Sequence, residues 1–145
     1  MTVNKPNELP WPKILFVCAG NVARSQMAEA YYNSFTNSNN GSSAGVLDFT
    51  PLKYSHPAEE VIQAMKEDGI DVSRNKVKYI TEEMARQSDK IIIMCHKEQC
   101  PDFLLKSSKV IFWPVDDPFG TDLDNFRKIR DVIKAKVISI IKSGV

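Results

Sequence analysis

Three short runs of apolar residues, far apart along the chain, constrain the fold more than any other feature of this sequence. They are KILFVC at 13–18, KIIIMC at 90–95 and KVIFW at 109–113. A short, continuous apolar run is typical of a strand that is buried on both faces, as strands are in parallel sheets. A fourth, weaker strand is expected at 43–47.

Segments with helical patterns separate these runs. We expect helices after about Arg24, over 57–68, after Thr81 and over 124–141. Strands that alternate with helices predict an α/β fold, here a four-stranded parallel sheet flanked by helices. The length of 145 residues suits a single domain, which we place at 13–145, after an extended N-terminal tail at 1–12.

Charge and cysteine content exclude several classes of protein. With 19 Lys and Arg against 18 Asp and Glu, the net charge of +1 offers no broad surface for nucleic acid or for an anionic membrane. No apolar run approaches the ~18 residues of a membrane helix, and the N-terminus lacks the apolar segment of a secretory signal. Three cysteines do not suit a secreted disulfide scaffold, so we expect a cytoplasmic protein.

A cysteine and an arginine bracket a loop that is suited to binding an oxyanion. Cys18 ends the first strand, and Arg24 opens a helix six positions later. Gly20 and Asn21 tolerate left-handed backbone conformations, so the loop can turn its N–H groups inward. The guanidinium of Arg24 can bind two oxygens of a tetrahedral anion. The expected oxyanion-binding residues are Ala19, Gly20, Asn21, Val22, Ala23 and Arg24.

The same loop predicts a nucleophile. An electropositive loop at a helix N-terminus favours the thiolate of Cys18, which is the form that attacks, and Ser25 can donate a hydrogen bond to it. The alternative is a buried structural cysteine and a surface arginine, because a bare C-x5-R pattern also occurs by chance. The strand before the loop, the helix after it and the trailing Ser25 favour the catalytic interpretation.

An aspartate pair before a proline follows the last strand. The segment Asp116-Asp117-Pro118 could be an ordinary turn, or it could present a carboxyl group as a general acid. The cysteine loop makes the second interpretation the better one, since a leaving oxygen needs a proton.

The other two cysteines, Cys95 and Cys100, allow three interpretations. Both could be structural, or they could bind zinc together with His96, although a fourth ligand is lacking. The third possibility is a redox pair, in which Cys95 attacks an adduct on Cys18 and Cys100 then attacks Cys95. The four intervening residues match about one helical turn, so we expect this segment to distort or unwind when the pair closes.

The segment FVCAGNVARSQMAEA resembles the signature of the low-molecular-weight protein tyrosine phosphatase superfamily, which includes the thioredoxin-coupled arsenate reductases. The resemblance covers about 13–141 and implies a three-layer fold. It implies that Cys18 is the nucleophile, that Asn21 shapes the loop, that Ser25 tunes the thiol and that Asp117, rather than its neighbour, is the acid.

Within this superfamily the sequence resembles the reductases most. They carry a cysteine at the position of Cys95 and another before a proline, as in Cys100-Pro101. The resemblance implies reduction of arsenate, resolution by the two cysteines and regeneration by thioredoxin, with no cofactor. Phe119, after the Asp-Pro pair, resembles the phosphatases instead. The alternatives are therefore hydrolysis of phosphotyrosine or small phosphoesters through a phosphocysteine, and a non-catalytic module that binds oxyanions.

Some reductases of this superfamily hold a cation. The matching positions are Asn21, Glu29 and Ser43, but a further acidic ligand falls near Lys78, which cannot bind a cation while charged. We predict no bound potassium or other metal, and we expect Lys78 to supply the positive charge.

Overall fold

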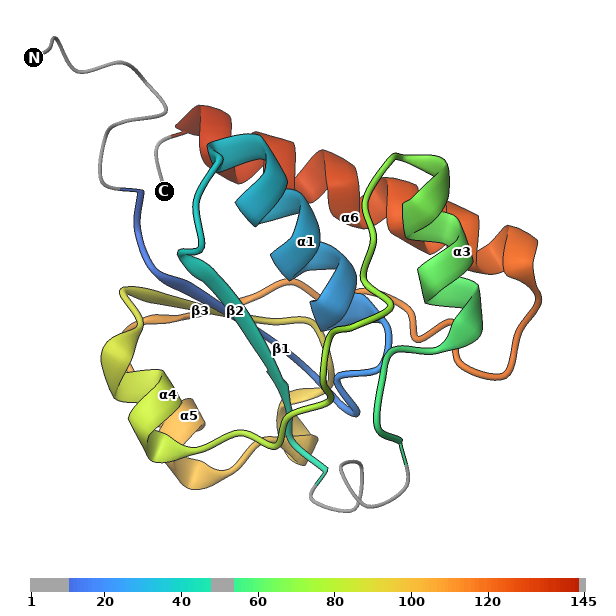
Figure 1. The fold of residues 1–145 in the computed structure, drawn as a ribbon. Helices are drawn as coiled ribbons and strands as arrows, with labels where there is room; N and C mark the ends of the chain where they lie inside the picture. The colour runs from blue at the N-terminus through green and yellow to red at the C-terminus, as the bar shows by residue number, and fades with distance from the viewer. Residues whose placement is uncertain (1–10, 48–53, 144–145) are drawn as a thin grey trace, which may run out of the picture.

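The computed structural model describes residues 11–47 and 54–143 and contains one parallel sheet of four strands (Figure 1). The strand order is β2-β1-β3-β4. The strands are β1 (Ile14–Cys18), β2 (Gly41–Gly45), β3 (Lys90–Ile93) and β4 (Val110–Phe112). This confirms the predicted fold class, with the two strongest apolar runs at the centre of the sheet. Most of the expected tail, at 1–10, lies outside the described residues.

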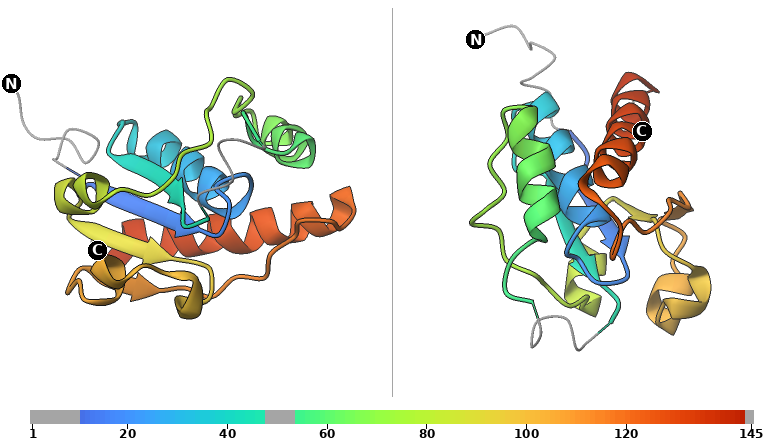
Figure 2. Two further views of the ribbon diagram at one scale, coloured as in Figure 1. Left: turned by 90° about the horizontal axis from the view of Figure 1, so that it is seen from below. Right: turned by 90° about the vertical axis from the view of Figure 1, so that its right-hand side faces the viewer.

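Helices cover both faces of the sheet and make three layers (Figure 2). Three of them lie on one face, and the shorter α4 and α5 lie on the other. The helical segments are α1 (Arg24–Thr36), α3 (Glu59–Glu67), α4 (Glu82–Gln87), the 3-10 helix η2 (Lys97–Gln99), α5 (Asp102–Leu105) and α6 (Leu123–Ser143). Across the described ranges, no helix is both long enough and apolar enough to cross a membrane.

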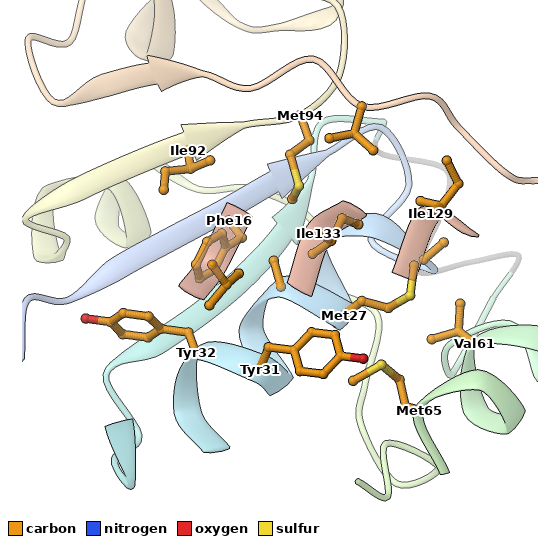
Figure 3. Packing of buried hydrophobic residues seen from close by; sticks show 14 of the residues in the cluster. Phe16, Met27, Tyr31, Tyr32, Val61, Met65, Ile92, Met94, Ile129 and Ile133 are labelled. Carbon is orange, nitrogen blue, oxygen red and sulfur yellow. The ribbon is translucent and has the colours of Figure 1, made fainter. Parts of the chain in front are cut away.

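Alternating residues of the central strands divide the core into two clusters. On one face Phe16, Ile92 and Met94 pack against α1, α3 and α6 (Figure 3). On the other face Val17 and Ile93 pack toward α4 and α5. The first two apolar runs therefore reflect burial on both faces of β1 and β3, as the sequence predicted. The expectation is wrong for the third run, because β4 is an edge strand in which Ile111 and Phe112 are exposed.

Two expectations about the elements need correction. Strand β2 spans Gly41–Gly45 rather than 43–47, because Gly45 pairs with the last residue of β1. The next two residues instead donate backbone hydrogen bonds to the carbonyls of Cys18 and Ala19, at 3.1 and 3.0 Å. The sequence analysis also missed η2 and α5, which are too short to show a helical period.

The carboxyl ends of all four strands meet at one edge of the sheet, which is where ligands bind in folds of this kind. Cys18 ends β1, and Cys95 lies two residues beyond β3. Asp117 follows β4 in the chain. The fold thus brings the predicted chemical groups to one edge although they are far apart in sequence.

Candidate active site

The loop between β1 and α1 turns on Asn21. Its φ of 57° is left-handed, whereas Gly20 is not among the residues with positive φ, so one of the two predicted permissive positions supplies the turn. This conformation directs the Asn21 backbone N–H to the Cys18 sulfur at 3.3 Å. A fixed N–H donor at the sulfur suits a thiolate at Cys18, as the predicted nucleophile requires.

The Asn21 side chain is held from several sides. Its Oδ1 accepts hydrogen bonds from Gln26 Nε2 at 3.0 Å and from the Lys78 backbone N–H at 2.9 Å. Its Nδ2 donates to Ser25 Oγ at 2.7 Å. Because Ser25 Oγ accepts this bond, its own hydrogen is available for the Cys18 sulfur, which lies 3.0 Å away. The arrangement supports the predicted role of Ser25.

The loop rests on Gly45, at the end of β2. A Cβ placed at Gly45 would lie 2.8 Å from the Gly20 carbonyl carbon and 2.9 Å from the Asn21 nitrogen. Both are backbone atoms, so they cannot move aside without deforming the loop. The sequence analysis missed this residue, and its only signal was a glycine at the end of a weak strand.

We expect Gly45→Ala to weaken oxyanion binding and catalysis, because the added methyl group pushes on the backbone that presents the loop N–H groups. The overpacking should also lower the free energy of unfolding by about 1–3 kcal/mol. Phosphate affinity by calorimetry and denaturant unfolding measure the two effects. Gly69→Ala is the control for phosphate affinity only, because its added Cβ meets no neighbouring atom within 4 Å, while its φ of 78° strains an alanine and lowers stability by itself. Equal phosphate affinity in the two variants would contradict this role of Gly45.

Arg24 is buried and is fixed by two strand ends. Its Nη1 donates to the carbonyls of Met94 and Val115 at 3.0 and 2.9 Å. Its Nη2 lies 3.5 Å from Asp117 Oδ2. These contacts hold the guanidinium at the site and explain why Arg24, at the start of α1, is only 5% exposed.

The two aspartates occupy different positions. Asp117 lines the cavity over Cys18 together with Arg24, and its Oδ1 accepts the Phe119 backbone N–H at 3.0 Å. Asp116 lines a neighbouring groove but not this cavity. Of the two aspartates, Asp117 thus lies at the Cys18 cavity, and its role as the acid stays a prediction.

The cavity over the Cys18 sulfur has a volume of about 190 Å³. The oxyanion loop forms its floor, and two aromatic residues, Tyr54 and Phe119, form part of its wall. Their rings meet edge to face, with centroids 5.8 Å apart. The cavity can hold a tetrahedral anion, and the rings can contact an apolar group attached to it.

Cys95 and Cys100 pack in one apolar cluster that also contains Ala19 of the oxyanion loop. Burial raises the pKa of the Cys95 thiol to about 12, with smaller contributions from the charges of Cys100 and Cys18. Burial also raises the pKa of Cys100, while its hydrogen bond with Cys95 opposes this shift. A groove of about 300 Å³ runs past Cys95 to Arg24. The structure thus brings all three cysteines to one region.

The positions matched to a cation site also come together. Ser43 Oγ donates a hydrogen bond to Glu29 Oε1 at 2.6 Å. Burial lowers the pKa of Lys78, and the negative charge of Glu29 opposes this shift. Lys78 Nζ donates to the Lys76 carbonyl at 3.0 Å. In the part of the chain that the structure describes, no three His, Cys, Asp or Glu side chains are grouped as metal ligands.

The site is of a phosphatase-like class. It combines a cysteine loop at the end of the first strand, an arginine at the start of the next helix and an aspartate after the last strand. Residues 13–143 match the model of the low molecular weight phosphotyrosine protein phosphatase family, and the chain belongs to this family.

Several curated relatives of this chain are named arsenate reductases. Arsenate reductase 2 of Staphylococcus epidermidis is 33% identical over 128 residues, which cover 87% of this chain and 93% of the relative. The arsenate reductase of Brevibacillus brevis is 33% identical over 135 residues, covering 90% and 95%.

Solved structures support the same fold. An arsenate reductase in the phosphate binding state has a TM-score of 0.77 and 28% identity, covering 92% of this chain and 99% of the other. A low molecular weight protein tyrosine phosphatase from T. tengcongensis has a TM-score of 0.77 at 24% identity, covering 90% and 97%. The second likeness concerns the fold alone.

Proposed function

We propose that this protein reduces arsenate to arsenite through a cysteine adduct. The observation that carries the proposal is the placement of Cys95 and Cys100 beside the oxyanion loop, since a phosphatase has no use for two further thiols there. The curated relatives named arsenate reductase, at 33% identity, support the same activity.

The reaction begins with attack of the Cys18 thiolate on arsenic. The loop N–H groups and Arg24 bind the oxyanion, and Asp117 gives a proton to the oxygen that leaves as water. The product of this step is a thiol-arsenate adduct on Cys18.

Cys95 then attacks the sulfur of Cys18. The sulfur–arsenic bond breaks, and its electron pair stays on arsenic, which is reduced from As(V) to As(III) and leaves as arsenite. The two sulfurs are oxidised together to a Cys18–Cys95 disulfide. Attack by Cys100 on Cys95 moves the disulfide to Cys95–Cys100 and releases the Cys18 thiolate.

The partner that reduces this last disulfide is proposed to be thioredoxin, which acts in the reducing cytoplasm. No cofactor takes part in the scheme, because the electrons come from the cysteines. The proposed partners are thus a small oxyanion and a dithiol protein.

Hydrolysis of an aryl phosphate is the second candidate, and the aromatic pair Tyr54 and Phe119 favours it. The rings can hold a phosphorylated phenol over Cys18, and water would then resolve a phosphocysteine. This reaction uses Cys18, Arg24 and Asp117 but neither resolving cysteine.

Two assays on the same preparation test the proposal. The first measures arsenite formation with thioredoxin, thioredoxin reductase and NADPH, and the second measures hydrolysis of an aryl phosphate. Multiple turnovers of arsenate support the reductase. Efficient hydrolysis of the aryl phosphate without arsenate turnover would instead establish the phosphatase.

We expect Asp117→Asn to slow hydrolysis of an aryl phosphate by roughly 10²–10⁴-fold, because the amide cannot protonate the leaving oxygen. Asp116→Asn is the matched control and should have a much smaller effect, since Asp116 does not line the Cys18 cavity. Steady-state kinetics of the two variants measure the difference. The opposite order of effects would reassign the acid.

A further inference from the structure

A glutamine in the first turn of α1 is completely buried, and the chemistry proposed above does not use it. Gln26 is 0% exposed. A buried amide needs internal partners for its oxygen and for its N–H groups. Gln26 Nε2 donates to the Lys76 carbonyl at 2.9 Å and also contacts both oxygens of Asn21, while Oε1 accepts a hydrogen bond from Asn75 Nδ2 at 3.1 Å. All of its polar groups are therefore committed to contacts within the protein.

The Gln26 amide binds Asn21 through both of that residue's oxygens. Nε2 lies 3.2 Å from the main-chain oxygen of Asn21 and 3.0 Å from its side-chain Oδ1. One nitrogen can reach both oxygens only where they converge, so this contact restricts the side-chain torsions and the backbone ψ of Asn21. Asn21 is also the residue whose φ of 57° makes the turn of the oxyanion loop. Gln26 thus acts on the residue that shapes the loop.

A segment before α4 fixes the orientation of this amide. The Nδ2 of Asn75 donates to the amide oxygen of Gln26, so the amide nitrogen faces the other way, toward the Lys76 carbonyl and Asn21. A flipped amide would place its oxygen against three other oxygens and would leave the Asn75 donor without its acceptor. The surroundings of Gln26 therefore permit one orientation, in which it donates to Asn21.

We infer that Gln26 is a positioning residue, which holds Asn21 in the left-handed turn that directs its backbone N–H to the Cys18 sulfur at 3.3 Å. The inference rests on the proposed function in one respect, that Cys18 is the nucleophile. It applies to arsenate reduction and to phosphoester hydrolysis alike, because both begin at that sulfur.

The physical need for such a residue lies in the backbone of Asn21. Asparagine tolerates the left-handed region better than most residues, but extended and right-handed conformations still compete with it. In those conformations the Asn21 N–H no longer points to Cys18, and the loop N–H groups lose their common direction. A thiolate and a bound oxyanion both depend on these donors. Loss of the Gln26 amide should therefore weaken both together.

Gln26→Met tests this role, because it removes the amide and keeps nearly the same side-chain length. Two quantities are measured at neutral pH: the rate at which iodoacetamide alkylates Cys18, located by peptide mass spectrometry, and phosphate affinity by calorimetry. We expect each to fall by about three- to tenfold, the effect of one net hydrogen bond. Gln63→Met is the matched control, since the exposed Gln63 side chain lies on α3 and donates to Glu67 at 3.5 Å. It should leave both quantities unchanged.

A double-mutant cycle with Asn21→Gly separates positioning from a general loss of stability. Glycine adopts the left-handed conformation without support and lacks the Oδ1 that Gln26 holds. In that background Gln26→Met should slow alkylation by no more than about twofold, because the side chain on which Gln26 acts is gone. Equal losses in the two backgrounds, or equal values for Gln26→Met and Gln63→Met, would overturn the positioning role.

Asn75→Ala is a milder variant at a half-buried position, and it keeps the Gln26 amide while removing the bond that orients it. It should lower the alkylation rate and the phosphate affinity by a smaller factor than Gln26→Met, and unchanged values would contradict the orientation argued above. None of these measurements uses arsenate or an aryl phosphate. The expected values in a protein that does not turn over arsenate would refute the proposed reductase and leave the positioning role in place.

Discussion

Cys18→Ser is expected to reduce both arsenate reduction and aryl phosphate hydrolysis to background, a loss of about 10⁴–10⁶-fold. A serine hydroxyl stays protonated where a thiolate forms, and the groups around Cys18 are donors rather than bases. Phosphate binding should persist, because the loop N–H groups and Arg24 remain. Calorimetry with phosphate and the two activity assays measure these outcomes.

The control for this variant is Cys100→Ser, which removes a buried thiol without touching the oxyanion loop. It should keep aryl phosphate hydrolysis near the wild-type rate. Turnover of either substrate by Cys18→Ser at a rate close to wild type would remove Cys18 as the nucleophile.

Cys95→Ser is expected to stop multiple turnover of arsenate while sparing phosphate chemistry. Without the Cys95 sulfur the adduct on Cys18 cannot be resolved, so arsenite is not released. Cys100→Ser should allow one turnover and then trap the Cys18–Cys95 disulfide. Peptide mapping by mass spectrometry identifies that cross-link, and arsenite counted per protein gives the number of turnovers.

The same step carries a pH dependence. Because burial raises the pKa of Cys95 to about 12, its reactive thiolate is scarce at neutral pH and increases about tenfold with each pH unit. The single-turnover rate of disulfide formation in Cys100→Ser should therefore rise with pH across the neutral range, provided that this step limits the rate. If both serine variants turn over arsenate repeatedly and no Cys95–Cys100 bond forms in the wild type, the phosphatase becomes the better account.

The sequence predicted those features that depend on contiguous residues. The apolar runs identified β1, β3 and β4, and the spacing from Cys18 to Arg24 identified the loop, because a strand end, a loop and a helix start follow one another in the chain. The family and the fold class are confirmed. The catalytic roles of Cys18, Arg24 and Asp117 remain predictions that the variants above test.

Features built from backbone atoms of distant segments could not be predicted. The support of the loop by Gly45 depends on the register of β2 against β1. Two backbone carbonyl groups fix Arg24 in addition to its contact with the Asp117 side chain, and such carbonyl partners leave no signal in the sequence. The Gln26 contact with Asn21 is local, yet glutamine in a helix gives no signal of its partner. The η2 helix has only three residues, too few to show a helical pattern of apolar residues, so the sequence could not predict it.

The contact between Arg24 and Asp117 places a carboxylate of the protein in competition with any anion that binds to the guanidinium. The Asp117 carboxylate lies 3.5 Å from Nη2, the Arg24 nitrogen that does not donate to the carbonyls of Met94 and Val115. An oxyanion that binds to Nη2 must therefore displace the negatively charged Asp117 side chain from it. Neutralising Asp117 should therefore tighten the binding of a non-reacting anion such as sulfate even as it slows turnover. We thus expect one side chain to oppose anion binding and, as the predicted acid, to speed turnover.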